Sequence, residues 1–397
     1  ELGFDEPQAR IRRLRAMNLL LRLEEADTGA YHPIFEAFLR ARAQETWSSD
    51  RHALHLTRAA QALRQKRPEA ALECAVAAGD EPLAIALVRE VAPVYLAEAR
   101  YEALNRALDL LPEAWHGRSP WPHQFRAESA RLTGRIEAAL ASLDVASHLA
   151  RAAGDDAARG WSLATRAACL GSRGEARARD LAREALETLG DQEPAARAFA
   201  WNVTGMMAQM AHELRDARHA FEQAGALYRL AGDALGESKV QHNLGLLLAR
   251  EGDFARAALT YRESIRLAGA AGRRAHAATH TNLATLHMQL AEYETAWQEG
   301  EVALSLADQV GSPRDTGWTR LTLGMTAART GQLAIADEHF EATARLARDL
   351  GDRPLEALAL AGQADMARNQ GNLDRARSWL DQAVALRGLP LEAPGMI

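Results

Sequence analysis

Aromatic residues are scarce in this sequence, since Phe, Trp and Tyr together make up 6% of its 397 residues. β-Branched residues are also few, whereas Ala, Leu, Arg and Glu are abundant. These abundant residues form helices readily, and a hydrophobic share of 48% is enough for a large buried core. The composition therefore argues against disorder and against a β fold, and it predicts an all-α protein.

Lysine is nearly absent, since the chain has only Lys66 and Lys239, and the formal net charge is -6. The arginines are scattered and form no basic stripe of the kind that binds duplex DNA or an anionic membrane. The densest basic run, "RIRRLR" at residues 10–15, is more typical of the solvated face of a helix than of a nucleic-acid site. We therefore expect no direct contact with nucleic acid or with a membrane.

Long apolar runs and closely spaced cysteines are missing as well. No stretch approaches the ~18 apolar residues of a membrane-spanning helix. Cys74 and Cys169 lie far apart in Ala-rich runs, which predicts inert buried thiols and a reducing, cytoplasmic location. The sequence starts at Glu1 without a signal-peptide pattern, which suggests a piece excised from a longer protein.

The main positive feature is an internal repeat of about 40 residues. Its turn signals lie at Gly134, Gly174, His212, Gly252, Ala291, Gly331 and Gly371, with spacings of 40, 38, 40, 39, 40 and 40 residues. A second turn signal closes each repeat, as in "AAGDD", "LAGDA" and "DLGDR". Two turns per period, with apolar residues at helical spacing between them, predict two helices per repeat.

The segment Asn243–Ala268, "NLGLLLAREGDFARAALTYRESIRLA", resembles a tetratricopeptide repeat with lengthened helices. The resemblance rests on small residues in the first helix and large residues in the second, which are Gly205, Gly245, Ala284, Gly324 and Ala364, and Phe221, Tyr261 and Phe340. About seven such hairpins cover residues 121–386. The resemblance implies a right-handed α-α superhelix whose first helices line a concave groove.

The head of the chain does not match the repeat. Residues 5–23 are predicted to be a helix, residues 18–32 to form a short β-wing, and residues 34–45 another helix, which together suggest the end of a winged-helix module. The phrase "YHPIFEAFLRAR" resembles the end of the ATPase module of MalT-like activators, the ATP-dependent LuxR-group regulators of the STAND class. The next segment is similar to that family's helical linker, with Pro68 and Pro82 at helix starts. The predicted domains are residues 1–46, 47–118 and 119–389, with a tail at 390–397.

Catalytic and nucleotide-binding signals are missing from the sequence. Neither lysine follows a Gly-rich phosphate loop, so the resemblance implies ATP only in a module outside this chain. His276 and His280 could share a metal by their spacing, but packing against neighbouring helices is the favoured interpretation, and His287 lies too far along the helix. No nucleophile elbow and no distinctive carboxylate pair is present. We therefore expect no enzyme activity, no metal and no cofactor in this chain.

The tetratricopeptide resemblance places a set of polar and aromatic side chains on the groove-facing side of the first helices. They are Trp161, Asn202, Lys239, His242, Asn243, Arg250, Asn282, Thr285, Gln289, Trp318, Thr322 and Arg329. The three asparagines recur at similar distances before their turns, which predicts an amide ladder that suits a sugar, a peptide or a small polar effector. Alternatively, the amides only bond the backbone between adjacent helices, and both interpretations stay open.

Two functions are consistent with these observations. The family resemblance implies an effector-sensing domain of a signal-responsive transcriptional activator, which controls an ATPase module outside this chain. The alternative is a stand-alone tetratricopeptide scaffold that binds a partner protein or peptide in the groove.

Overall fold

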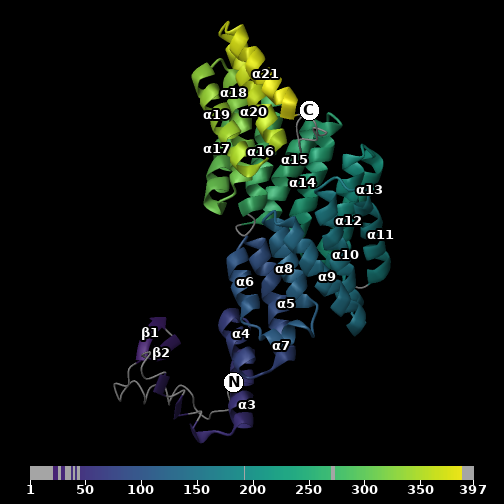
Figure 1. Cartoon of the computed structure of the whole chain (residues 1–397), viewed down its shortest axis with the longest axis vertical. Helices are drawn as coiled ribbons and strands as arrows, with labels where there is room; N and C mark the ends of the chain where they lie inside the picture. Colours follow the sequence, from purple (N-terminus) through teal and green to yellow (C-terminus); the bar gives the residue numbers. More distant parts are fainter. Residues whose placement is uncertain are drawn as a thin grey trace. The chain divides into compact units, whose positions relative to one another are not determined.

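The structure is a computed structural model that describes residues 21–25, 28–31, 37–38, 41–42, 45–191, 193–269 and 273–386. This part of the chain contains 19 helices, α3 to α21, and one pair of strands, β1 and β2 (Figure 1). The contacts divide the chain into two compact units. The first unit is Glu1–Leu96 together with Tyr101–Ser129, and the second unit is Ala97–Arg100 together with Ala130–Ile397. Helices make up nearly all of the described regular structure, as the composition predicts.

The strands β1 (Leu21–Glu25) and β2 (Thr28–Tyr31) pair antiparallel in the first unit. The prediction of a helix through Leu23 is therefore wrong for residues 21–23, which belong to β1. Apolar and charged residues alternate there, and a period of two suits a strand. The pair falls within the segment predicted as a wing. Residues 1–20 and most of residues 32–44 lie outside the described residues, so the winged-helix module itself stays a prediction.

Two of the helices of the first unit begin at the prolines that predict them. The helices of this unit are α3 (Ser49–Leu63), α4 (Pro68–Ala77), α5 (Glu81–Ala97), α6 (Tyr101–Asp109), α7 (Glu113–His116) and most of α8 (Trp121–Leu132). Pro68 is the first residue of α4, and Pro82 lies in the first turn of α5. The predicted domain boundaries stay predictions, because the two compact units divide inside α8.

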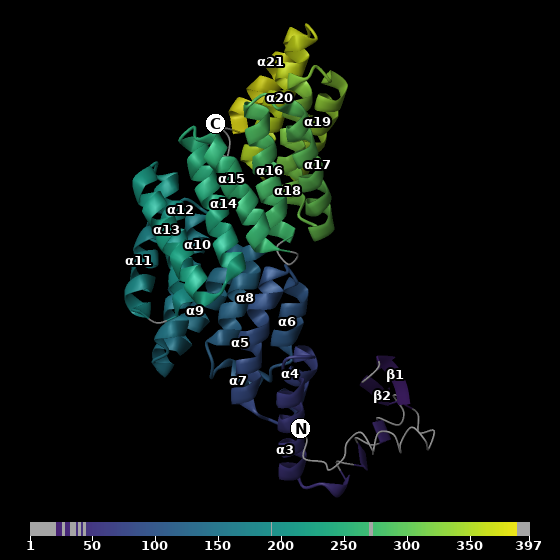
Figure 2. The ribbon, with the colours of Figure 1, turned by 180° about the vertical axis from the view of Figure 1, so that it is seen from behind.

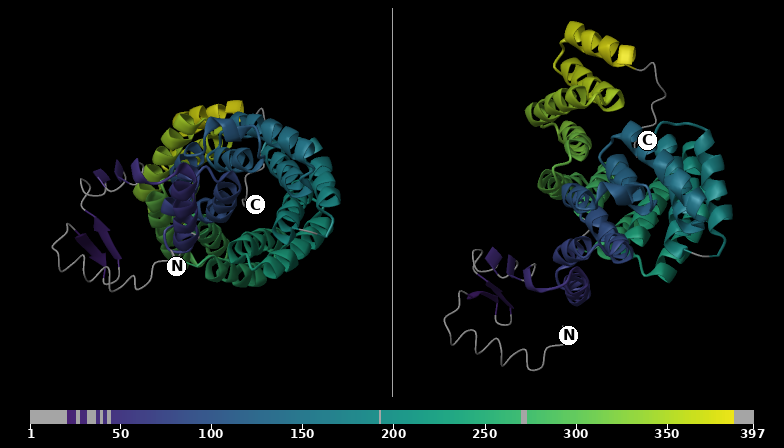
Figure 3. Two further views of the ribbon diagram at one scale, coloured as in Figure 1. Left: turned by 90° about the horizontal axis from the view of Figure 1, so that it is seen from below. Right: turned by 60° about the horizontal axis from the view of Figure 1, so that its bottom comes forward.

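The second unit is an array of helical hairpins that follow one another in sequence order (Figures 1 and 2). After α9 (Ile136–Ala153), the hairpins are α10 (Asp156–Gly171) with α11 (Arg177–Leu189), α12 (Pro194–Met210) with α13 (Leu214–Ala231), α14 (Ala234–Arg250) with α15 (Phe254–Ala268), α16 (Arg273–Gln289) with α17 (Tyr293–Val310), α18 (Pro313–Arg329) with α19 (Leu333–Leu350), and α20 (Arg353–Asn369) with α21 (Leu373–Leu386). Consecutive first helices also touch, and Figure 3 shows the array following a curve. Stacked helical hairpins are thus confirmed, while the right-handed sense of the superhelix stays a prediction.

The turn between the two helices of each repeat uses a left-handed residue. All seven residues predicted from the repeat have positive φ angles: Gly134, Gly174, His212, Gly252, Ala291, Gly331 and Gly371. Glycine adopts this conformation without a steric penalty, which explains its recurrence. His212 (φ 59°) and Ala291 (φ 60°) adopt it against their own preference.

Small residues of the first helices receive aromatic rings from the second helices. A Cβ atom added to Gly205 or Gly245 would lie 2.5 Å from the ring of Phe221 or Tyr261 respectively. The aromatic side chains at these positions are among the largest buried side chains of the protein. They are Phe221, Tyr261 and Phe340. The small and large positions predicted from the sequence therefore meet in the cores of three hairpins, α12–α13, α14–α15 and α18–α19.

None of the described helices is both long and apolar enough to span a bilayer.

Candidate functional site

All twelve candidate residues lie on the first helices of the hairpins in the second unit, but they differ in burial. Asn202 and Thr322 are buried, and Lys239, Gln289 and Arg329 are exposed. The others, Trp161, His242, Asn243, Arg250, Asn282, Thr285 and Trp318, are half-buried. The expectation of an amide in an open groove is wrong for Asn202, whose residue is 7% exposed.

The candidate amides connect consecutive repeats through side chains. Asn243 on α14 donates a hydrogen bond of 2.9 Å from Nδ2 to Oδ1 of Asn202 on α12. Asn282 on α16 places its Nδ2 atom 3.3 Å from Nε2 of His242 on α14. The bonding between adjacent helices that the architectural interpretation expects is therefore present, but its partners are side chains and not the backbone.

Hydroxyl groups continue this pattern toward α18. Thr281 and Thr319 place their Oγ1 atoms 2.8 Å apart, and the Oγ1 atoms of Thr285 and Thr322 are 3.3 Å apart. We call the whole set the polar seam: Asn202, His242, Asn243, Thr279, Thr281, Asn282, Thr285, Thr319 and Thr322. The seam links four consecutive first helices, α12, α14, α16 and α18.

The seam retains hydrogen-bonding capacity for a ligand. A primary amide has two N–H donors and a carbonyl oxygen. Asn243 and Asn282 each use one N–H in the seam, and among the described residues neither carbonyl oxygen accepts a hydrogen bond. Both side chains are half-buried, so these oxygens can accept a bond from an incoming group.

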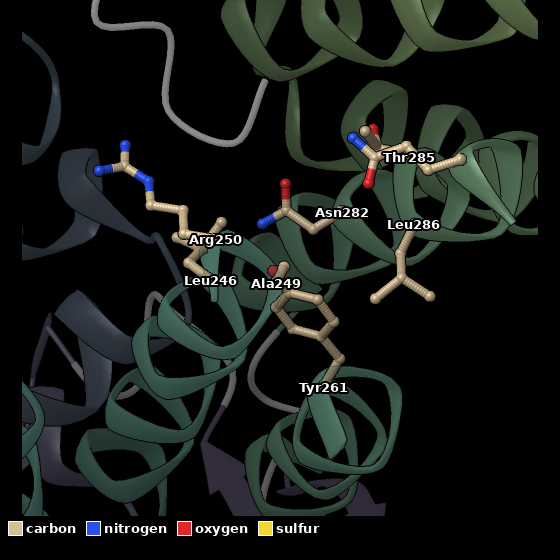
Figure 4. A pocket seen from close by; sticks show the side chains of 8 residues that line it. Leu246, Ala249, Arg250, Tyr261, Asn282, Thr285 and Leu286 are labelled. Atoms are coloured by element: carbon tan, nitrogen blue, oxygen red, sulfur yellow. The ribbon is translucent and has the colours of Figure 1, made fainter. Parts of the chain in front are cut away.

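A small pocket lies beside the seam between α14, α15 and α16 (Figure 4). It encloses about 20 Å³, which is roughly the space of one water molecule. Its lining combines Leu246, Ala249, Tyr261 and Leu286 with four of the candidate residues, Arg250, Asn282, Thr285 and Gln289. The structure thus brings a cation, two amides and a hydroxyl group together with aliphatic and aromatic walls.

Arg250 is held in place at this pocket by the preceding repeat. Its Nη1 atom donates a hydrogen bond of 3.3 Å to the backbone oxygen of Gln209. A guanidinium group has five N–H donors, so most of its capacity is available to an anionic or carbonyl ligand group.

The remaining candidates lie away from the pocket. Trp161 stacks on Phe199, with ring centroids 5.8 Å apart, and Trp318 packs against the core of the α18–α20 region. Lys239 and Arg329 are exposed, and none of the four lines the pocket. Of the twelve predicted site residues, four therefore line one pocket, and the others belong to the seam or lie elsewhere on the first helices.

The predicted list lacks three threonines of the seam and the four pocket walls, which are Thr279, Thr281 and Thr319, and Leu246, Ala249, Tyr261 and Leu286. A signal exists for two of the threonines, because Thr279 and Thr319 each lie 12 residues before the turn residue of their repeat, Ala291 and Gly331. The ring of Tyr261 was predicted only as a core residue.

The histidines have separate partners. Burial lowers the pKa of His242 to about 4, and this ring contacts Thr279 through Nδ1 and Asn282 through Nε2. His280 bonds Glu299 and His287 bonds Glu292, at 2.5 Å and 2.6 Å. Within the described part of the chain, no three His, Cys, Asp or Glu side chains gather in a way that could hold a metal ion.

The fold and the seam define a helical-hairpin repeat array. Profiles of the tetratricopeptide repeat match residues 238–270 and 315–387, so the chain carries tetratricopeptide repeats. No curated protein sequence shows significant similarity to it.

Solved structures share the fold at low sequence identity. A Signal Transduction ATPase with Numerous Domains (STAND) protein with a tetratricopeptide repeat sensor from Pyrococcus horikoshii matches with a TM-score of 0.69 and 17% identity. The match covers 97% of this chain, which spans 59% of the length of that protein. A Rap protein complexed with competence and sporulation factor has a TM-score of 0.59 at 12% identity, covering 86% of this chain and 98% of that one. The quorum sensor NprR from B. thuringiensis has a TM-score of 0.55 at 14% identity, covering 96% and 99%.

Proposed function

We propose that this chain is the sensing part of a signal-responsive transcriptional activator, in which the repeat array binds an effector and controls an ATPase module outside the chain. The observation that carries the binding part is the pocket beside the polar seam, where four predicted site residues converge. The fold shared with a STAND protein that has a tetratricopeptide repeat sensor supports the regulatory part, because that match includes the linker helices as well as the repeats.

The chemistry of the pocket favours a short peptide as the effector. Asn282 offers a carbonyl oxygen for an N–H group, and Arg250 offers donors for a nearby carbonyl or carboxylate. Leu246 and Ala249 are half-buried beside these polar groups, so an apolar side chain of the ligand can lie over them, outside a pocket that has the space of about one water molecule. A peptide supplies all three groups within one residue, and the Rap protein of the same fold is complexed with competence and sporulation factor. A sugar or another small polar effector fits the polar groups but not the apolar walls.

Binding at this position would act on the contact between repeats. Asn282 belongs to α16, whereas its partner His242 belongs to α14. A ligand that favours one arrangement of these two helices shifts the population of the array toward that arrangement. We propose that this shift is transmitted through the repeats and linker to the ATPase module. In this scheme the chain itself is not an enzyme, acts in the cytoplasm and touches no nucleic acid.

Thermal shift measurements test the binding step. The purified chain is screened against a library of short synthetic peptides and a panel of sugars and small polar metabolites, since a ligand raises the melting temperature according to its concentration over Kd. A peptide hit should bind at least tenfold more weakly to Arg250→Ala and Asn282→Ala. The matched control is Leu259→Ala, whose exposed leucine lies on a second helix outside the pocket.

Two results would contradict the proposal. Hits whose affinity is unchanged in both pocket variants would move the site elsewhere. If a peptide binds as expected but no ATPase module responds to the binding, the result would favour the stand-alone scaffold. A gene that encodes a phosphate-binding loop upstream of Glu1 would support the activator.

A further inference from the structure

The last helix of the array, α21, carries an uncovered apolar stripe. Leu373, Leu380 and Val384 are 67%, 52% and 55% exposed. They are separated by seven and four residues, so they share one face of the helix. The helix lies at the end of the stacked hairpins in the second unit (Figure 1).

The positions equivalent to Leu380 and Val384 are buried in the preceding hairpin. Leu380 lies nine residues after Gly371, as Phe340 lies nine after Gly331, and Phe340 is 2% exposed beside α20. Val384 corresponds to Ala344, which is 1% exposed. Among the described residues the stripe is therefore a core face of the repeat without a covering helix, and such faces in repeat arrays need a cap.

The described residues leave this face uncovered. Residues 387–397, which follow α21, include Pro390 and Pro394, and proline disfavours a helix interior.

We propose that the stripe binds the same stripe of a second copy of this chain. Leu373, Arg377, Leu380 and Val384 are spaced by four, three and four residues, a pattern that reads the same in both directions. Antiparallel pairing about a two-fold axis therefore places Leu373 against Val384 of the partner subunit. It also places Leu380 against the aliphatic stem of the partner's Arg377.

The charges beside the stripe complement this pairing. Arg377 and Asp381 are exposed, and neither has a hydrogen-bond or ion-pair partner among the described residues. Since Asp381 follows Leu380 directly, the antiparallel arrangement brings Arg377 next to Asp381 of the partner subunit. The two-fold axis also brings Asp381 next to Arg377 of the partner subunit. Arg375 is engaged differently, because its guanidinium lies 4.3 Å from the ring centroid of Trp379.

Sedimentation equilibrium of the full chain tests this proposal, over concentrations from about 1 μM to about 200 μM because one helix face gives a small interface. We expect a monomer–dimer equilibrium whose Kd rises at least tenfold in Leu380→Glu. The single variants Arg377→Asp and Asp381→Arg should each dimerise more weakly, because like charges then meet. A mixture of these two variants should form heterodimers, because opposite charges then meet in both ion pairs, one with its original sign and one reversed.

The controls separate the proposal from general loss of folding. Leu259→Glu changes an exposed leucine of α15 outside the stripe and should leave the dimer unchanged. Circular dichroism melting should show that every variant keeps the fold. A monomer at all concentrations, or a dimer unaffected by Leu380→Glu, would overturn the proposal. Dimerisation only after removal of residues 387–397 would also overturn it, since that segment would then be the occupant.

Discussion

Asn282 and His242 belong to consecutive repeats, and Nδ2 of Asn282 lies 3.3 Å from Nε2 of His242. Because the amide nitrogen carries only donors, this bond requires that Nε2 is unprotonated. The proton of the neutral ring then lies on Nδ1, which donates to Oγ1 of Thr279 at 2.9 Å. The contact between α14 and α16 therefore depends on the protonation state of one imidazole.

The first prediction is that the stability of the chain falls as pH is lowered from 6.5 to 4. Burial lowers the pKa of His242 from 6.5 to about 4, so between these values the unfolded state binds more protons than the folded state. The free energy of unfolding therefore decreases as pH falls through this window, and the effect is absent above it. At about 1.4 kcal/mol per pKa unit, the contribution is at most about 3 to 4 kcal/mol.

Urea unfolding of wild type and His242→Gln across this pH window measures the effect. Glutamine keeps an acceptor for Asn282 but does not titrate, so the variant should lose less stability than wild type as pH falls. Burial also lowers the pKa of His123, His276 and His339, so only the difference between the two proteins reports on His242. Parallel pH profiles for both proteins would contradict the prediction.

A second prediction concerns the close contact of Gly245 with Tyr261. A Cβ atom at Gly245 would lie 2.5 Å from the ring, which is shorter than any normal contact. Gly245→Val should therefore lower the free energy of unfolding by about 1 to 3 kcal/mol, the usual cost of overpacking. Urea denaturation measures the change.

Gly225→Ala is the matched control for this variant. Gly225 also lies within a helix, but its added Cβ would meet Val240 at 3.5 Å, an ordinary contact distance. Alanine restricts the unfolded chain more than glycine, so this variant should be neutral or gain about 0.5 to 1 kcal/mol. An equal loss in both variants would mean that the ring contact is not the cause.

The hairpins could be predicted from the sequence because their signals are local. A left-handed turn strongly favours glycine, and a helix that receives a ring requires a small residue, so both features recur with the period of the chain. The strand at residues 21–25 was assigned in part to a helix, since short apolar runs carry little information on period.

The partners of the site residues could not be predicted in the same way. Asn202 and Asn243 are 41 residues apart, and their bond depends on how two helices are staggered and on two rotamers. The sequence placed both on the first helices correctly, but it gave no measure of burial, so Asn202 was expected in an open groove. The threonine partners left a recurring signal, although threonine is too common in these helices to stand out.

A third prediction is that Ala291→Gly stabilises the array. Ala291 has a φ angle of 60°, a conformation in which an L-residue with a Cβ atom is strained by about 1 kcal/mol or more. Glycine removes this strain, as it does at Gly252, where φ is 81°. We expect a gain of about 1 kcal/mol for Ala291→Gly and a loss of similar size for Gly252→Ala. Thermal melting of both variants measures this, and a loss in both would contradict the prediction.

A fourth prediction is that the chain alone neither hydrolyses ATP nor binds duplex DNA specifically. Both lysines lack a preceding Gly-rich loop, and the arginines form no continuous basic stripe. A phosphate-release assay with Mg²⁺ and a DNA mobility-shift assay measure these properties. ATP turnover that copurifies with the chain through several columns would contradict the expectation.

The final prediction separates architecture from recognition within the polar seam. Asn243→Ala should lower the free energy of unfolding by about 1 to 3 kcal/mol, because it removes the partner of the buried Asn202 amide. Asn282→Ala should cost less, because its partner His242 keeps the bond to Thr279 and the Asn282 side chain is only half-buried.

The same two variants should behave in the opposite order when a pocket ligand is measured. Asn282 lines the pocket and Asn243 does not, so Asn282→Ala should weaken the binding of a peptide hit at least tenfold while Asn243→Ala changes it little. Urea unfolding and titration calorimetry on the same preparations give both quantities. If Asn282→Ala loses as much stability as Asn243→Ala and binds the peptide normally, the amides serve only to join the repeats, and the recognition site must lie on another face of the array.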